Sequence, residues 1–272
     1  MRADKLRHKS IVSRTRKIHP QLPLSRRPSR RTSHEERASS IDAPKNRLLA
    51  ALPADDYRRL LPHLTAFPMR CQQVLQKQGE TIEHVYFPNG GVCSVVAMLS
   101  SGATAQVAAI GDEGIVGIEA IFTDDAVASG ERLVQIADGD VLSLSVVEFR
   151  RELARRGALH DIAGRYAHAK VAEFVQSVAC NTAHTVQERC VRWLLEIHDR
   201  VHRNDFELSH ELMAMMLGAN RSTVTIIAGT LQTAGFIRYR RGHVEVLDRE
   251  GLEAACCECY AQIRAAFARQ RV

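Results

Sequence analysis

The sequence has no long run of apolar residues, and this absence excludes one broad class of protein. A helix that crosses a bilayer needs about 18 or more consecutive apolar residues, and no segment of the 272 residues approaches that length. Residues 1–43 also lack the apolar middle of a secretory signal peptide. We therefore expect a cytoplasmic protein with no membrane partner.

An excess of basic charge is missing from most of the chain. Residues 1–40 contain 12 Lys and Arg against 3 Asp and Glu, whereas the rest contains 25 against 28. The formal net charge of +6 therefore does not mark the folded body as a basic nucleic-acid binder. We expect residues 1–43 to be a disordered tail. It either adds weak, non-specific attraction to DNA or reflects a start codon assigned too far upstream, and both are favoured over a targeting peptide.

Sequence patterns of the common enzyme classes are also missing. The chain has no glycine-rich phosphate loop, no nucleophile elbow and no metalloprotease pattern, which predicts a protein that is not an enzyme. Its seven cysteines are an odd number in a chain without a secretory signal, which favours free thiols in a reducing compartment.

Candidate metal ligands are few. Cys256, Cys257 and Cys259 are close in sequence, but no second cysteine pair has a suitable spacing to complete a zinc or iron–sulfur site of about four ligands. We expect free thiols on a terminal helix, with Cys256 and Cys259 on one face. His198 and His202 lack a nearby acidic or cysteine partner, so the sequence predicts no metal and no cofactor.

Regularly spaced turn residues indicate a β domain in the first half of the chain. Residues 46–64 alternate Leu pairs with charges at helical spacing, which predicts two short helices broken near Pro53. From Phe67 to about Leu144, turn residues about every ten positions separate short apolar runs, as in a small all-β sandwich or barrel. Residues 92–99 and the run from Ala103 predict a hairpin.

A long helical region follows, because almost no helix breaker occurs from Val146 to Arg200. Residues at 4-3-4 spacing form a seam of the kind that two helices share in a coiled coil. The seam consists of Ala167, Val171, Phe174, Val178 and Asn181. We expect it to pair two subunits, and the alternative is that it covers the β domain. Thr185 to Glu188 match a capping box, so a new helix begins there and the boundary is a natural hinge.

The segment from Leu208 to Leu247 predicts a helix, a short turn, a second helix and a hairpin. In the second helix, Ser222, Thr225, Ile226 and Gly229 share the face opposite the apolar stripe. A solvated face favours Lys, Glu and Gln, and a mid-helix Gly costs about 1 kcal/mol relative to Ala. Small side chains make sense if this face enters the major groove of double-stranded DNA.

The sequence places Arg238, Arg240 and Arg241 at the tip of the hairpin, where they suit contacts with the phosphate backbone. The alternative is a helical hairpin that contacts protein, with a solvated basic turn. Ser209 and Asn220 are placed as helix N-caps, and Gly218 closes the first helix. The expected DNA-contacting residues are Ser209, Asn220, Arg221, Ser222, Thr223, Thr225, Ile226, Arg238, Arg240 and Arg241.

This order of β domain, long helix and winged helix-turn-helix resembles the Crp/Fnr-type bacterial transcription regulators over residues 45–260, most strongly in "LSHELMAMMLGANRSTVTIIAGTLQTAGFIRYRRGHVEVLD". The resemblance implies an α+β fold with a β-roll like that of cyclic-nucleotide-binding domains. The expected domains are the tail at 1–43, the β-roll sensor at 44–156, the dimerisation helix at 157–184 and the winged helix-turn-helix at 185–272. The resemblance places Arg221, Ser222 and Ile226 at the family's base-reading positions, where Arg, Glu and Arg are usual, so a different operator is expected.

The family's β-roll often binds a cyclic nucleotide, through a Gly-Glu pair and an Arg followed by Ser or Thr. Here one residue separates Gly117 from Glu119, and Arg132 is the nearest arginine, although strand alternation makes it a poor fit. A buried phosphate without a guanidinium partner is badly compensated. The resemblance therefore implies an effector pocket at these residues that does not bind cyclic AMP in the usual way and whose ligand is unknown.

The expected function is a sequence-specific transcription regulator, a homodimer on a palindromic operator with half-sites about 34 Å apart. Its partners are double-stranded DNA and a second copy of the chain, with RNA polymerase as a further candidate. The alternatives are a redox- or metal-responsive sensor and a ligand-binding signalling module whose helix-turn-helix contacts protein.

Overall fold

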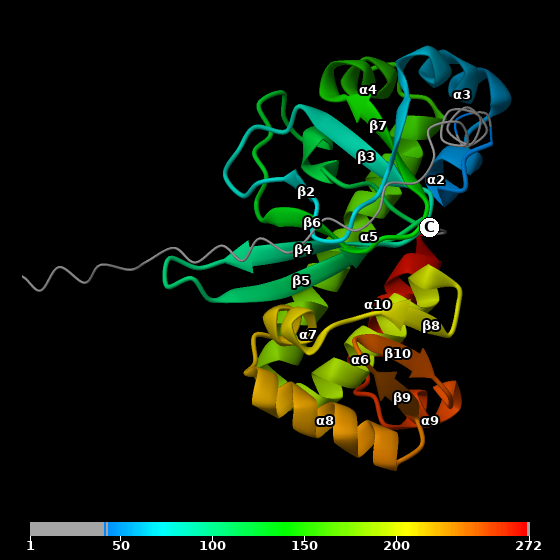
Figure 1. Cartoon of the computed structure of the whole chain (residues 1–272). Coiled ribbons are helices and arrows are strands. Elements are labelled where there is room, and N and C mark those ends of the chain that lie inside the picture. Colours follow the sequence, from blue (N-terminus) through cyan, green and yellow to red (C-terminus); the bar gives the residue numbers. More distant parts are fainter. Residues whose placement is uncertain (1–40, 42, 271–272) are drawn as a thin grey trace, which may run out of the picture.

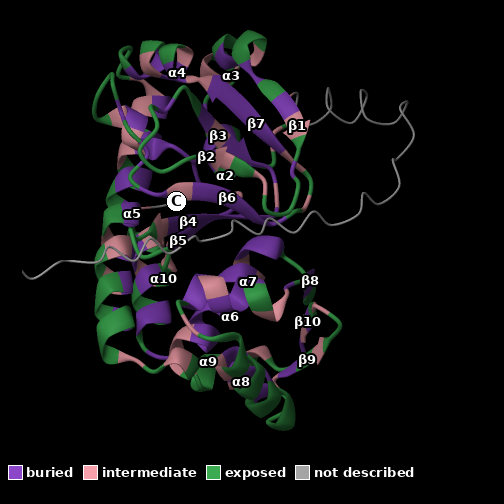
Figure 2. Cartoon of the chain, turned by 60° about the vertical axis from the view of Figure 1, so that its left-hand side comes forward, coloured by how far each residue is buried: buried purple, intermediate pink, exposed green. Residues whose placement is uncertain are grey.

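The computed structural model describes residue 41 and residues 43–270, so nearly all of the tail expected at 1–43 lies outside the described residues. A β domain and a smaller carboxy-terminal domain lie at opposite ends, and the long helix α5 runs along one side of both (Figures 1 and 2). Within the described part of the chain, no helix combines the length and the apolar character needed to span a membrane.

Two short helices open the described chain. They are α2 (Arg47–Ala50) and α3 (Ala54–Leu60), and a 3-10 turn follows at Leu61–His63. The break predicted near Pro53 is confirmed. The buried Asn46 caps α2 and also donates hydrogen bonds to the carbonyl oxygens of Pro88 and Gly114, which ties this helix to the β domain.

The β domain consists of two antiparallel sheets, with strand orders β1-β7-β3 and β2-β6-β4-β5. The strands are β1 (Thr65–Pro68), β2 (Val74–Gln76), β3 (His84–Pro88), β4 (Val92–Met98), β5 (Thr104–Ile110), β6 (Glu131–Ile136) and β7 (Asp140–Ser145). A 3-10 turn, η2 (Ile118–Ile121), lies between β5 and β6. The predicted β region and the predicted hairpin, which is β4 paired with β5, are both confirmed.

The helical region from Val146 to Arg200 is divided into α4 (Val146–Leu153), α5 (Ala158–Ala183) and α6 (Val186–Val201). Arg156 has a positive φ of 51° in the connection before α5. The second break is the predicted one: Thr185 and Glu188 form both hydrogen bonds of a capping box.

The carboxy-terminal domain contains β8 (Asp205–Glu207), α7 (His210–Leu217), α8 (Arg221–Thr233), β9 (Ile237–Arg240), β10 (His243–Val246), α9 (Arg249–Ala254) and α10 (Cys259–Arg269). The predicted hairpin of β9 and β10 is confirmed, and β8, which was not predicted, pairs with β10 to complete a small sheet. The last helix, α10, returns to pack against α5.

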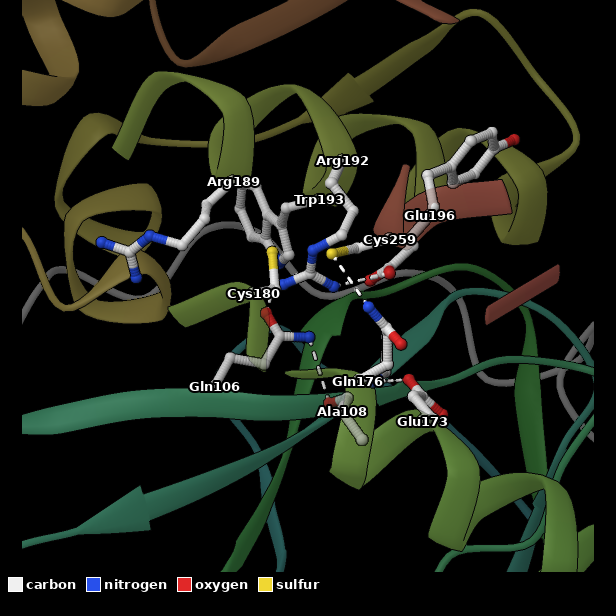
Figure 3. A network of polar contacts seen from close by, with 12 residues as sticks. Gln106, Ala108, Glu173, Gln176, Cys180, Arg189, Arg192, Trp193, Glu196 and Cys259 are labelled. Atoms are coloured by element: carbon white, nitrogen blue, oxygen red, sulfur yellow. Dashed lines mark hydrogen bonds and ion pairs between the residues drawn. The ribbon is translucent and has the colours of Figure 1, made fainter. Parts of the chain in front are cut away.

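One hydrophobic cluster joins the two domains. It includes Val92, Val96 and Leu133 of the β-roll together with buried residues of α6, α7 and α8. Trp193 of α6 donates a hydrogen bond to Gln106 of β5, as Figure 3 shows from close by. The carboxy-terminal domain is therefore packed directly against the roll, which determines the direction in which α8 faces.

Candidate functional site

The turn between α7 and α8 is built by local capping. The Ser209 hydroxyl accepts a hydrogen bond from the Leu212 N–H at 3.1 Å, and Gly218 ends α7 with a φ of 60°. Both predictions are confirmed. Asn220 occupies the N-cap position of α8, but its side chain makes no capping hydrogen bond.

Helix α8 separates into a buried and an exposed face, as its sequence predicts. Val224, Ile227, Ala228 and Leu231 are buried, whereas Ala234, which the sequence also places in this stripe, is exposed. The opposite face carries the exposed Ser222, Thr225, Ile226 and Gly229, with Thr223 half-buried beside them. Ile226 is 70% exposed. Figure 2 shows α8 as an exposed ridge at the end of the molecule.

His210 connects this helix to the wing and was missed by sequence reasoning. Its ring stacks on Tyr239 of β9 with a centroid distance of 4.1 Å, and its Nδ1 lies 3.1 Å from the Thr225 hydroxyl. Desolvation lowers the pKa of His210, and the nearby Arg221 lowers it further. The neutral imidazole thus holds α7, α8 and β9 in register. The packing of α7 and β9 against α8 brings these residues together from three elements, so no local pattern marks them.

Two of the predicted DNA-contacting arginines, Arg221 and Arg238, are each paired with a carboxylate. Arg221 is 68% exposed and its Nη1 lies 3.0 Å from Glu211, an exposed pair of small energetic value. Arg238 was predicted to lie at the tip of the wing, and this is wrong. It lies opposite Glu245 in the strand register and is paired with it at 2.5 Å.

Arg240 and Arg241 are exposed at the tip of the wing. Within residues 43–270, neither has an ion-pair partner. Arg241 and Gly242 have φ values of 51° and 81°, a conformation that gives a tight turn. The wing therefore presents two unneutralised guanidinium groups beside the exposed face of α8.

The expected effector-pocket residues do lie together. Gly117, Glu119 and Arg132 line a cavity of about 80 Å³ between the roll and α5. Strand alternation was expected to make Arg132 a poor fit, yet its side chain does reach the cavity: it is 2% exposed, is paired with Glu119 and donates to the Gly130 carbonyl oxygen. Burial lowers the pKa of Arg132 and Glu119 opposes that effect, so the charge is already balanced. Small-molecule pockets usually measure about 300–1,000 Å³, so this cavity is too small for a nucleotide as it stands.

The residues of the expected dimer seam lie on two faces of α5. Ala167 is buried and Phe174 half-buried, and both line the cavity beside the roll, as the covering alternative predicts. The exposed apolar residues here are Val171, Val175 and Val178, which are 52%, 66% and 68% exposed, and Val171 also lines that cavity.

Asn181, at the end of the predicted seam, is exposed and accepts a hydrogen bond from Arg189 at 3.0 Å. Of the predicted seam, the exposed apolar residues are Val171 and Val178, and Val175, four residues after Val171, is exposed beside them. The exposed apolar stripe is therefore Val171, Val175 and Val178.

The terminal cysteines do not share one helix, contrary to expectation. Helix α9 ends at Ala254 and α10 begins at Cys259, so Cys256 and Cys257 lie in the connection between them. Cys257 and Cys259 instead lie close to Cys180 and His184, at the carboxy-terminal end of α5.

The histidine pair does not converge. His198 contacts Asn204 at 2.9 Å, whereas His202 contacts Asp112 of the roll at 3.0 Å. Each ring is thus held by its own neighbour.

Comparisons with known proteins agree with this geometry. Residues 188–255 match the model of the Crp-like helix-turn-helix domain. No curated protein has a significantly matching sequence. Among solved structures, a Crp/Fnr-family regulator from Eubacterium rectale has a TM-score of 0.60 at 14% identity and covers 78% of this chain and 98% of its own.

Two further structures have a similar likeness. FixK2 from Bradyrhizobium japonicum has a TM-score of 0.60 at 16% identity, over 71% of this chain and 98% of its own. The c-di-GMP-responsive global regulator CLP of Xanthomonas campestris has a TM-score of 0.59 at 15% identity, over 71% and 99%. At these identities the likeness is one of fold. Residues 188–255 are thus a Crp-like helix-turn-helix domain, and the described chain has the fold of the Crp/Fnr-type transcription regulators.

Proposed function

We propose that this protein is a cytoplasmic transcription regulator that binds double-stranded DNA sequence-specifically as a homodimer and has no catalytic role. The observation that carries the proposal is the exposed face of α8, with Ile226 70% exposed among small residues and Gly229 without any atom within 4 Å of where a Cβ would stand. A helix with such a face can approach base edges closely in a major groove.

The neighbouring charges support DNA rather than a protein partner. Arg240 and Arg241 are exposed at the wing tip and suit phosphate contacts, which position the domain without reading sequence. In the first turn of α8, Arg221 can exchange its exposed partner Glu211 for a guanine edge at little cost, because the pair is solvated. Ile226 suits an apolar contact with a thymine methyl group.

The exposed valines of α5 support the homodimer. Val171, Val175 and Val178 recur at helical spacing on one face of the helix, and a second copy of α5 would cover them. Twofold symmetry would then place two α8 helices on inverted half-sites about 34 Å apart. The junction of α5 and α6 at Thr185 is where a change of angle would alter that spacing.

For the roll, we propose an effector other than cyclic AMP in its usual pose, or none. The Arg132 guanidinium that would receive a cyclic phosphate is already paired with Glu119 in a small cavity. A phosphate would have to displace that carboxylate and enlarge the cavity.

A mobility-shift assay on duplexes selected from a random pool tests the proposed function. Arg221→Ala should weaken binding by about 1–3 kcal/mol and relax the preference at one base pair of each half-site. Arg58→Ala is the matched control, since both side chains are 68% exposed and paired with a carboxylate, and Arg58 lies on α3. Equal affinities of the two variants, or no binding of any duplex at low salt, would refute the proposal.

A further inference from the structure

Four metal-ligating side chains from distant parts of the chain converge at the end of α5. Cys180 lies in its last turn and His184 is its C-cap residue, whereas Cys257 and Cys259 come from the connection to α10 and its first residue. Their donor atoms all lie within 4.8 Å of one another. No other group of His, Cys, Asp and Glu donors converges in this way among the described residues.

Two separations between these donors match those of a tetrahedral metal site. The sulfur atoms of Cys180 and Cys257 are 3.8 Å apart, and the Cys259 sulfur is 3.5 Å from His184 Nδ1. Metal–sulfur bonds of about 2.3 Å and metal–nitrogen bonds of about 2.0–2.1 Å at tetrahedral angles place two sulfurs about 3.8 Å apart, and a sulfur and a nitrogen about 3.5 Å apart. A disulfide would require about 2.05 Å.

The surroundings orient the donors as ligands. His184 Nε2 lies 3.3 Å from the Glu258 carboxylate, which leaves Nδ1 free to face the three sulfurs. A carboxylate on the outer nitrogen of a metal-bound histidine is a common second layer of such sites. Gln176 Nε2 donates to the Cys259 sulfur at 3.1 Å, which suits a thiolate acceptor (Figure 3).

Burial and charge also fit a bound cation. Cys180 and Cys259 are 0% and 1% exposed and Cys257 is 7% exposed, so three thiolates without a metal would be poorly solvated. Three thiolates and one divalent ion carry a net charge of −1. Arg192 of α6, itself largely buried, contacts Cys180 and brings a positive charge to that side of the cluster.

We propose that Cys180, His184, Cys257 and Cys259 bind one Zn²⁺ ion per chain. Three sulfurs and one imidazole are a donor set that Zn²⁺ prefers, and four protein ligands leave no open position, so the site is structural rather than catalytic. Binding releases the three thiol protons to water.

The ion joins the end of α5 to the far end of the carboxy-terminal domain. Cys180 and Cys257 are 77 residues apart in sequence, and the hinge at Thr185 directly follows His184. Bound Zn²⁺ therefore fixes the angle between α5 and the domain that carries α8. This consequence rests on the proposed DNA-binding function, whereas the metal site itself does not.

Cobalt substitution in the full-length protein tests the site. Reduced protein, freed of metal by a chelator without oxygen, is titrated with Co²⁺ and then with Zn²⁺. Wild type should bind one equivalent, with thiolate-to-cobalt charge-transfer absorption and the intense visible bands of tetrahedral coordination, and Zn²⁺ should remove both. Cys257→Ser keeps two thiolates, so at saturation it should lose about a third of the charge-transfer intensity, and it should bind at least about 100-fold more weakly.

Two further variants separate ligand loss from misfolding. Cys256→Ser is the matched control, because Cys256 neighbours Cys257 but is outside the converging set, and it should titrate like wild type. Glu258→Gln keeps all four ligands and changes a 67% exposed side chain. It should weaken binding about 10- to 100-fold while the circular dichroism spectrum is unchanged.

Failure of the site and failure of the proposed function give different results. Wild type without a charge-transfer band, equal spectra for Cys257→Ser and Cys256→Ser, or a disulfide between Cys180 and Cys257 in protein purified without oxygen would overturn the metal site, whatever the DNA result. A duplex bound equally well by metal-free and Zn²⁺-loaded protein would overturn the hinge consequence alone. The absence of DNA binding in both forms would overturn the proposed function and leave the site intact.

Discussion

Replacing Glu113 by Gln should destabilise the junction between the roll and the carboxy-terminal domain by about 3 kcal/mol. Arg200 of α6 donates from Nε to Glu113 at 2.9 Å, and the two side chains are 9% and 8% exposed. Removing one partner of a buried ion pair costs about 3–5 kcal/mol, because the other charge remains buried. We expect the lower end, since the Glu196 carbonyl oxygen still accepts from Arg200 at 2.9 Å.

Glu80→Gln is the matched control for this change. Glu80 is paired with Lys77 at 3.4 Å, but the two side chains are 62% and 66% exposed. Such a pair contributes about 0–1 kcal/mol, so this variant should unfold close to wild type. Urea unfolding at one fixed protein concentration measures both, because the stability of the proposed dimer would depend on concentration. Equal midpoints for the two variants would show that the Glu113–Arg200 pair does not hold the domains together.

The same variant has a pH dependence whose sign follows from the structure. Burial would raise the pKa of Glu113, but Arg200 and Lys170 outweigh it and hold that pKa below its usual value of 4.5. A lowered carboxyl pKa contributes stability that is present above the unfolded-state pKa and is lost as pH falls through the folded pKa. The difference between wild type and Glu113→Gln should therefore be full at pH 7 and shrink below about pH 4.5. A constant difference would contradict this assignment.

Three further predictions concern the helix turn, the dimer and the roll. Gly218→Ala should destabilise the fold by about 1–2 kcal/mol, because Gly218 has a φ of 60°. Gly229→Ala should stabilise the fold by about 1 kcal/mol, because the added Cβ would meet no atom within 4 Å. Thermal unfolding of the two variants checks these opposite signs. Val175→Asp, at a 66% exposed position, should yield a folded monomer in sedimentation velocity, and an unchanged dimer would remove the valine stripe from the interface. Calorimetric titration with cyclic AMP should show no binding while Arg132 stays paired with Glu119, and micromolar binding would refute that argument.

Sequence alone determined the local architecture of the carboxy-terminal half. The capping box at Thr185, the N-cap at Ser209 and the positive φ at Gly218 each depend on residues within four positions of one another. The two faces of α8 follow from its 3.6-residue repeat, so the exposure of Ile226 was predictable. Short-range sterics and hydrogen bonds decide such features before any distant segment arrives.

Only the tertiary structure decided where distant segments meet. Strand alternation made Arg132 a poor fit to its pocket, the helical seam put Phe174 on an open face, and the cysteine spacing left the terminal cysteines without partners. The fold turns Arg132 towards Glu119 and brings Cys257 to Cys180 across 77 residues. Helix and strand periodicities define which faces are apolar, but the partner of each face depends on how loops close and helices cross, and no local pattern contains that information.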